Sequence, residues 1–244
     1  MAYYNRKLQL YNTLFSIHNS SIKDLEIIIT DDASREEERI EDLVKQFDIK
    51  IKIIRINPEE KTWVNPCIAY NMAIKLAEGK FIMIQNPECF HFGDVIKHFI
   101  KNIKNKTYCI YSVFGFNAEY SNILSEKCKQ NEYKDIVNGM EKYIPFFSKD
   151  NYSGIWYNHA RFRKRPYHFL SGMNLININR LRGFNEKFSQ GHWFDDDEFF
   201  YRCRKIMSIN NIPPMPIGIH QEHISISKLE LIEINRKIYK NICK

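Results

Sequence analysis

The chain has 244 residues, of which 44% are hydrophobic and 27% charged, a globular composition that excludes wholesale disorder. Lys and Arg number 36 against 29 Asp and Glu, a net charge of +7, and the 9 Gly and 8 Pro are too few for collagen-like or linker architectures. No stretch approaches the roughly 20 apolar residues of a membrane span, and the first residues lack the apolar run of a signal peptide. The six scattered cysteines form no Cys-x-x-Cys pair, which predicts reduced thiols and a cytoplasmic location.

The first half of the chain alternates between two kinds of hydrophobic pattern. Short β-branched runs predict strands at 25–30, 51–56 and 81–84, and helical spacing predicts helices at 6–20, from 34 through 47, and at 71–78. This alternation indicates an α/β fold with a parallel sheet.

The second half is less regular. We expect helices at 94–103, 196–206 and from 227 onwards, strands at 108–114, 174–178 and 217–219, and an irregular stretch with a helix or two at 115–150. No internal repeat or low-complexity linker divides the chain, which predicts a single compact domain.

Polar clusters follow two of the predicted strands. Asp31 and Asp32 come after the first strand, and Asn86 and Glu88 come after the third. Ligands of parallel sheets lie beyond the carboxyl ends of the strands, so we expect both clusters to line one crevice.

Two further clusters lie in the second half, the acidic run 195–198 and the pair His220 and His223. Carboxylates together with imidazoles suit Mn²⁺, Mg²⁺ or Zn²⁺. The alternatives are that the acids only complement a helix dipole and that the histidines are structural.

Several motifs resemble the family 2 glycosyltransferases of GT-A fold. In the first half they are Tyr4-Asn-Arg6, the run 26–34 (Glu-Ile-Ile-Ile-Thr-Asp-Asp-Ala-Ser) and the segment 71–82. Gly183-Phe-Asn-Glu186 and the run 193–202 resemble a galactosyltransferase-type second half, and the segment 220–222 is similar to the His-Gln-Glu of chondroitin-polymerase-like transferases.

The resemblance implies a GT-A (Rossmann-like) nucleotide-sugar-binding sheet with helices on both faces, within one glycosyltransferase domain spanning 1–244. Residues 1–114 would be the nucleotide-sugar-binding half, 115–226 the acceptor-binding and catalytic half, and 227–244 a C-terminal helix. The family's first strand would precede Tyr3, so the sheet is expected to lack it.

The resemblance also implies a pocket for the nucleotide. Asp31 and Asp32 would accept hydrogen bonds from the base or ribose, because an ionised carboxylate is purely an acceptor. Tyr4, Asn5 and Arg6 would line the same pocket, although Arg6 is equally compatible with a surface position.

A metal site is implied as well. Glu88 would take the metal position of the family's Asp-x-Asp, with Asn86 beside the nucleotide sugar and His220 as a second ligand. The expected cofactor is Mn²⁺, or Mg²⁺, which would stabilise charge on the departing diphosphate of a UDP-sugar. Asn86 replaces the first aspartate of that motif, so one charged ligand is absent.

Asp196 aligns with the family's catalytic base, which takes a proton from the acceptor hydroxyl in an inverting transfer. Asp195 and Asp197 would bind acceptor hydroxyls or position Asp196, and Trp193 would offer an aromatic face to a sugar ring, with burial in the core as its alternative. The basic stretch 161–165 would neutralise diphosphate or be a solvated loop.

The segment 84–89 is similar to a variant seen in transferases of giant viruses, which would place the protein in host cytoplasm or a virion. The implied partners are a nucleotide sugar and a glycan or glycoprotein acceptor. Two alternatives stay open: a catalytically inactive glycan- or protein-binding module, and a metal-dependent nucleic-acid enzyme. The spread of basic residues along the chain argues against nucleic acid. Sugar, acceptor and oligomeric state are open.

Overall fold

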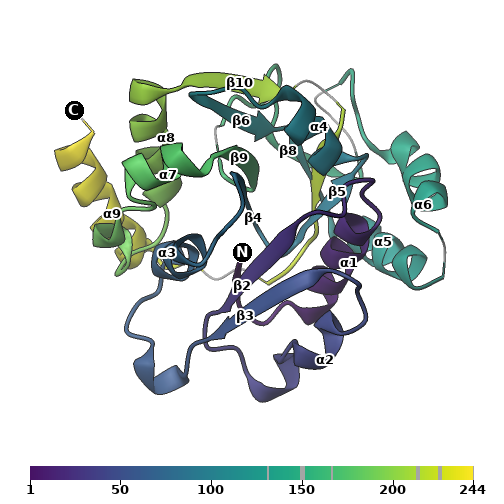
Figure 1. Cartoon of the computed structure of the whole chain (residues 1–244), viewed down its shortest axis with the longest axis horizontal. Helices are drawn as coiled ribbons and strands as arrows, with labels where there is room; N and C mark the ends of the chain where they lie inside the picture. The colour runs from purple at the N-terminus through teal and green to yellow at the C-terminus, as the bar shows by residue number, and fades with distance from the viewer. Residues whose placement is uncertain (131, 149–151, 166, 213–214, 225–226, 244) are drawn as a thin grey trace.

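The computed structural model describes residues 1–130, 132–148, 152–165, 167–212, 215–224 and 227–243. It is a mixed α/β structure in which short sheets are surrounded by helices (Figure 1). No helix in these ranges is long and apolar enough to cross a membrane. The predicted domain boundary at 226/227 touches residues outside the described ranges.

The first sheet is built from the amino-terminal part of the chain. Its strands run parallel in the order β1-β2-β3. They are β1 (Ala2–Tyr3), β2 (Glu26–Asp31) and β3 (Lys50–Arg55). The strand expected to be lacking is therefore represented by the two residues of β1.

The other two sheets each contain four strands of mixed direction. The second has the order β10-β6-β9-β4 and the third the order β5-β11-β7-β8. Their strands are β4 (Phe81–Gln85), β5 (Cys89–Phe92), β6 (Thr107–Tyr111), β7 (Val113–Phe116), β8 (Gly154–Asn158), β9 (Leu170–Asn174), β10 (Ser208–Ile212) and β11 (Ile217–His220).

The helices pack against these sheets. They are α1 (Lys7–His18), α2 (Glu41–Val44), α3 (Cys67–Lys75), α4 (Val95–Asn102), α5 (Ala118–Gln130), α6 (Tyr133–Met140), α7 (Leu175–Leu181), α8 (Asp195–Ile206) and α9 (Leu229–Ile242). Short 3₁₀ turns cover Glu36–Glu38, Pro58–Glu60, Glu141–Tyr143 and Glu186–Phe188.

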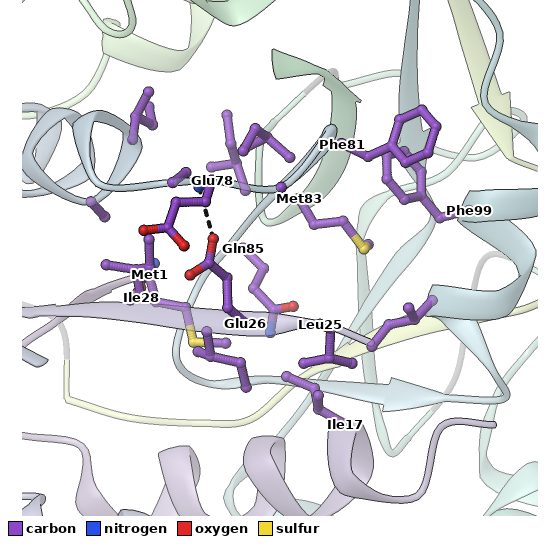
Figure 2. Close-up of a pocket in the computed structure, with 18 of the residues that line it drawn as sticks. Met1, Ile17, Leu25, Glu26, Ile28, Glu78, Phe81, Met83, Gln85 and Phe99 are labelled. Atoms are coloured by element: carbon purple, nitrogen blue, oxygen red, sulfur yellow. Dashed lines mark hydrogen bonds between the residues drawn. The ribbon is translucent and has the colours of Figure 1, made fainter. Parts of the chain in front are cut away.

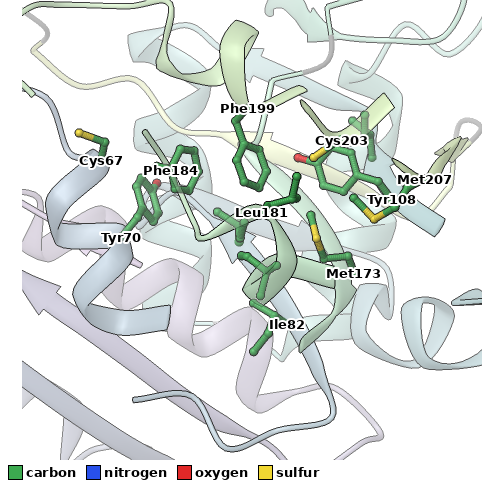
Figure 3. Packing of buried hydrophobic residues seen from close by; sticks show 13 residues of the cluster. Cys67, Tyr70, Ile82, Tyr108, Met173, Leu181, Phe184, Phe199, Cys203 and Met207 are labelled. Atoms are coloured by element: carbon green, nitrogen blue, oxygen red, sulfur yellow. The ribbon is translucent and has the colours of Figure 1, made fainter. Parts of the chain in front are cut away.

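Successive side chains of β2 point to opposite faces of the first sheet, and a helix lies against each face. Ile27 and Ile29 pack with the apolar face of α1, whereas Ile28 points to the other face, and α3 also lies against β2. A second core, shown in Figure 3, joins α3 to α7 and α8 through stacked rings, with Phe184 and Phe199 centred 4.4 Å apart.

Several expected elements are corrected by the structure. The segment predicted as a strand at 174–178 is the start of helix α7, because Ile178 and Leu181 face the core at helical spacing. The strand predicted at 108–114 is two strands that change sheet at Ser112. The helix predicted from 34 to 47 is only a 3₁₀ turn and the single turn α2.

The expected parallel sheet is confirmed for β1, β2 and β3, but β4 belongs to another sheet. Strand β4 pairs antiparallel with β9 and is not paired with β1 or β2. Helix α3 begins at Cys67, earlier than predicted, because Asn65 Oδ1 accepts a hydrogen bond from its amide. The strands that were not predicted are β1, β5, β8, β9 and β10.

Gly154→Ala should destabilise the fold, because a Cβ at this position would overlap the carbonyl oxygen of Gly115 on β7. We expect a loss of about 2 kcal/mol or more, as in overpacked cores, seen as a melting temperature lower by roughly 4 °C or more. Gly139→Ala in α6 is the control, since its Cβ would come no closer than 3.7 Å to Lys127 Nζ. Equal melting temperatures for the two variants would contradict the β7–β8 packing.

Candidate active site

A buried carboxylate lies at the centre of the site. Glu88 is 1% exposed, and its Oε2 accepts a hydrogen bond from Arg6 at 2.8 Å. Its Oε1 lies 3.2 Å from His220 Nε2 and 3.5 Å from His223 Nε2. It also accepts a hydrogen bond from the side-chain Nδ2 of Asn86 at 2.9 Å. Burial opposes ionisation of Glu88, but Arg6 and the histidines outweigh it and hold its pKa well below the usual value.

The strand pairing explains why these residues meet. Glu88 lies between β4 and β5, and His220, at the end of β11, is the register partner of Cys89 on β5. The buried side chain of Gln221 then donates to the carbonyl of Glu88 at 3.1 Å and accepts from Asn12 of α1 at 2.7 Å. Helix α1 and the segment after β11 are thereby fixed beside the β4–β5 turn.

The residues of this cluster fit a divalent cation. One ligand atom each of Glu88, His220 and His223 lies within 4.8 Å of the other two. Arg6 binds Oε2, whereas Oε1 faces the two imidazoles and the side-chain nitrogen of Asn86. A carboxylate with two imidazoles is a donor set that Mn²⁺ or Zn²⁺ accepts.

Some of the predicted nucleotide-binding residues lie on the segment that Arg6 connects to Glu88. The segment after β1 carries Tyr4, Asn5 and Arg6, and Asn5 is held by Ser34 Oγ, which accepts from its amide at 3.1 Å. Lys61 lies 4.4 Å from the ring centre of Tyr4 and pairs with Asp32 at 2.9 Å.

The two aspartates at the end of β2 have different surroundings. Asp32 also accepts from Trp63 Nε1 at 2.9 Å. Asp31 is fully buried and accepts from the Ser34 amide and from Arg55, at 2.9 and 2.7 Å. These contacts hold the Asp31 side chain in the loop, whereas Lys61 links Asp32 to the ring of Tyr4.

The acidic cluster opens α8. Asp195 is buried and accepts from Asn65 Nδ2 at 2.8 Å. Burial and the neighbouring Asp195 and Asp197 raise the pKa of Asp196 well above its usual value. Burial also raises the pKa of Asp197, against the opposing charge of Arg165. A carboxyl group with a raised pKa is a stronger base once ionised.

The motif at 183–186 forms the support of this helix. Asn71 Nδ2 donates to the Phe184 carbonyl and to Glu186, each at 2.9 Å, and Asn71 Oδ1 accepts from the Phe184 amide at 2.7 Å. Arg202 pairs with Glu198 at 2.7 Å. Asn71 thus holds the loop at 183–186, and Arg202 holds Glu198 in the first turn of α8.

Trp193 lies on the loop that leads into α8 and is 56% exposed. Its φ of 64° and that of Phe194, also 64°, are left-handed, a conformation that is unfavourable for bulky residues. Asn235 of α9, fully buried, holds the loop by donating to the Trp193 carbonyl at 2.9 Å. Strain of this kind is often found at ligand sites, and the exposed ring excludes a core role.

Electrostatic contacts connect the acidic and histidine clusters. The charges of Glu88 and Asp195 both act on Tyr70, whose pKa burial raises well above the usual value. Tyr70 also donates to Asn86 Oδ1 at 2.9 Å.

The basic stretch 161–165 lies between the same clusters. Its backbone is ordered by the bridge between His159 and Arg163. Arg163 lies 6.0 Å from the ring of Tyr157, which in turn packs on His220 at 4.6 Å between ring centres. Arg165 acts on Asp197 at the other end.

Some residues of the site were not predicted. His223 was noted beside His220 but not assigned as a ligand, although their three-residue spacing is a usable signal. Tyr70, Trp63 and Lys61 carried no recognisable sequence signal for a role here.

Glu88→Gln should weaken Mn²⁺ binding by at least about tenfold, because it removes the charged donor of the cluster. Isothermal titration of Mn²⁺ into both proteins measures the change. Glu126→Gln, an exposed glutamate of α5 paired with Lys129, is the matched control and should bind like the parent. Unchanged affinity in Glu88→Gln would remove this cluster as the metal site.

Asp196→Asn should stabilise the chain at neutral and higher pH. The raised pKa means that ionising Asp196 costs more in the folded than in the unfolded state, a penalty that is full above the folded-state pKa and absent below about 3.9. We expect a melting temperature roughly 2–4 °C higher near pH 8 and no gain near pH 3. Asp42→Asn is the control, since Lys45 lowers the pKa of Asp42. A loss of stability near pH 8 would contradict the assignment.

Comparison with known proteins gives one family match and several similar structures. The sequence profile of glycosyl transferase family 2 matches residues 1–206, and a search of curated protein sequences gives no match. Among solved structures, mannosyltransferase PcManGT from Pyrobaculum calidifontis, in complex with GDP-Man and Mn²⁺, is similar with a TM-score of 0.53 and 14% identity over 90% of this chain and 55% of that one.

Two structures of TarS from S. aureus are also similar. Residues 1–349 give a TM-score of 0.59 at 12% identity, covering 90% of this chain and 58% of that one, and a second structure gives 0.64 at 14%, covering 98% and 38%. The chain spans less than two thirds of each of these proteins, and the likeness shows that it has the GT-A fold. With more than half of its residues matched by the profile, the chain belongs to glycosyl transferase family 2.

Proposed function

We propose that this chain is a metal-dependent inverting glycosyltransferase that moves a sugar from a UDP-sugar to a hydroxyl of a glycan or glycoprotein. The observation that carries the proposal is the convergence of Glu88, His220 and His223 in one cluster beside Arg6. Family membership supports glycosyl transfer, and the Mn²⁺ bound by PcManGT supports a divalent cation.

The donor would lie against the amino-terminal segment. Tyr4 is half-exposed and offers a ring to the base, while Asp32 keeps acceptor capacity beyond its bonds to Trp63 and Lys61, since a carboxylate has about four acceptor sites. Uracil would donate its imide N–H to Asp32. Asn86 would lie beside the donor phosphates.

Glu88, His220 and His223 would hold the cation. When bound, it would supply Lewis-acid stabilisation of the departing diphosphate. Arg163 and Arg165 would add positive charge near the diphosphate, consistent with their positions near Tyr157 and Asp197.

The acceptor would bind at the amino end of α8. Its ring would pack on the exposed face of Trp193, and its hydroxyl would give its proton to Asp196 while the oxygen attacks the anomeric carbon. Asp195, held by Asn65, and Asp197 would position the acceptor and Asp196. A single displacement with one base inverts the configuration, and the second-half motifs at 183–186 and 193–202 support a galactosyltransferase-type acceptor half.

Titration with UDP and GDP, each with and without Mn²⁺, tests the donor and metal. We expect UDP to bind in the presence of Mn²⁺ and more weakly without it. Tighter binding of GDP, the nucleotide of the donor in PcManGT, would replace the UDP assignment. Failure of both nucleotides to bind would leave a non-catalytic module.

Asp196→Asn tests the base. It should lower the rate of UDP release from the active UDP-sugar by about 10²-fold or more, while UDP affinity stays near the parent value. Because ionised Asp196 is required and its pKa is raised, parent activity should fall as pH drops through a value above the usual aspartate range. Asp42→Asn should transfer at the parent rate, and an equally active Asp196→Asn would refute the assignment.

A further inference from the structure

The three residues that precede β9 lie between the histidine cluster and the acidic cluster of the candidate site. Phe169 packs on the histidine side, with its ring centre 5.5 Å from that of His220. Tyr167 lies on the acidic side, since burial raises its pKa and the charge of Asp196 raises it further. His168 is therefore placed between the candidate metal ligands and the candidate base.

This short segment is anchored to the end of β4. Leu170 opens β9 and is the register partner of Gln85, the last residue of β4. One residue earlier, the carbonyl of Phe169 accepts a hydrogen bond from the Asn86 amide at 3.1 Å. A side chain carried by backbone that is bonded in this way is held in a fixed direction, as a group that contacts a ligand must be.

The imidazole of His168 packs edge-on against two aromatic rings. Its centre lies 5.1 Å from that of Tyr70 and 5.0 Å from that of Phe184, at interplanar angles of 86° and 68°. His168 is half-buried, and its Nδ1 is enclosed without a hydrogen-bond partner among the residues that the structure describes. Because Nδ1 is enclosed, Nε2 is the ring nitrogen that a ligand would meet.

A separate cavity lies nearby but does not include this ring. It has a volume of about 570 Å³, lies between β2 and β4, and is lined mainly by apolar residues such as Ile28, Met83 and Phe99 (Figure 2). Tyr70 is among its lining residues, whereas His168, the candidate metal ligands and the candidate base are not. The imidazole therefore belongs to the candidate site and not to this cavity.

The charge state of His168 limits the group that it can bind. Burial lowers its pKa, against the opposing charges of Asp195 and Glu88, so the neutral ring is favoured at neutral pH. A neutral imidazole has one N–H and one lone pair, and a hydroxyl both donates and accepts, so the two match in either tautomer. A diphosphate oxygen only accepts, and cationic groups bind it more strongly.

We propose that His168 determines donor specificity, with its Nε2 forming a hydrogen bond to a hydroxyl of the transferred sugar. This rests on the proposed function, in which the leaving diphosphate lies at Glu88 and the base is Asp196, so that the anomeric carbon has to lie between them. His168 lies in the same interval. A sugar without the matching hydroxyl would leave the imidazole nitrogen unpaired, and a site built around such a bond discriminates strongly against it.

The test separates the sugar from the nucleotide. Titration in the presence of Mn²⁺ measures the affinity for UDP, UDP-glucose, UDP-galactose and UDP-N-acetylglucosamine, and for GDP and GDP-Man. His168→Phe keeps an aromatic ring and removes both nitrogens. We expect it to weaken binding of the nucleotide sugar that the parent binds best by about fivefold or more, while the bare nucleotide binds at the parent affinity.

Two further comparisons identify the hydrogen bond itself. Among monodeoxy analogues of that nucleotide sugar, one should bind the parent and His168→Phe equally, because the hydroxyl partner of the bond is already absent. His168→Gln returns an N–H near the position of Nε2 and should recover part of the lost affinity. If a melting curve shows that His168→Phe is unfolded, His168→Leu provides the same comparison.

His18→Phe is the matched control. His18 of α1 is also half-buried with an enclosed Nδ1 that has no partner among the described residues, but its ring packs on Phe47 in the core of the first sheet. This variant should bind every nucleotide and nucleotide sugar like the parent. A loss in His18→Phe equal to that in His168→Phe would overturn the proposal.

The outcomes also separate this proposal from the proposed function. If the parent binds none of the nucleotides, the proposed function fails and this proposal fails with it. If nucleotides bind but His168→Phe leaves the nucleotide-sugar affinity unchanged, or weakens sugar and bare nucleotide equally, only the role of His168 is overturned.

Discussion

The buried charge of Glu88 is the constraint on which the site depends. A carboxylate that is 1% exposed is tolerated only with charged or hydrogen-bonding partners. Here they come from distant parts of the sequence, Arg6 before α1 and the histidines His220 and His223 at and after the end of β11. The pairing of β5 with β11 and the bonds of Gln221 to α1 bring them together. The pairing of β11 with β5 therefore completes the third sheet and also brings the candidate metal ligands together.

In the second half of the chain, some residues of the motifs at 183–186 and 193–202 support helix α8, and others are candidates for the chemistry. Asn71 clamps the loop at 183–186, and Arg202 bonds the Gly183 and Leu181 carbonyls as well as Glu198. Such contacts fix the direction of the first turn of α8. Asp196 and the exposed Trp193 are then left at the rim, where strain in the backbone is balanced by the buried Asn235. A catalytic group that must contact a mobile acceptor has to be held rigidly and yet be accessible.

The hydrophobic pattern of the sequence predicted the strands that are determined by their own residues. The strands expected at 25–30, 51–56 and 81–84 are β2, β3 and β4 to within a residue or two, because β-branched runs bounded by polar loops have few other readings. At 174–178 the run Asn-Leu-Ile-Asn-Ile fits either period, and tertiary packing decided for α7. For the site, the pairing of β4 with β9, the position of Tyr70 and the contact of His223 with Glu88 depend on contacts between distant segments, which one sequence does not encode visibly.

The short strand β1 bears on the site because the chain runs from it into the candidate donor pocket. β1 has two residues, and the chain passes from it directly into Tyr4, Asn5 and Arg6. Arg6 holds one oxygen of Glu88, and Tyr4 lies under Lys61, so the geometry of the candidate donor pocket depends on how firmly β1 is anchored to β2. A two-residue strand with one covered edge is weakly anchored, since stability in sheets comes from paired neighbours on both sides.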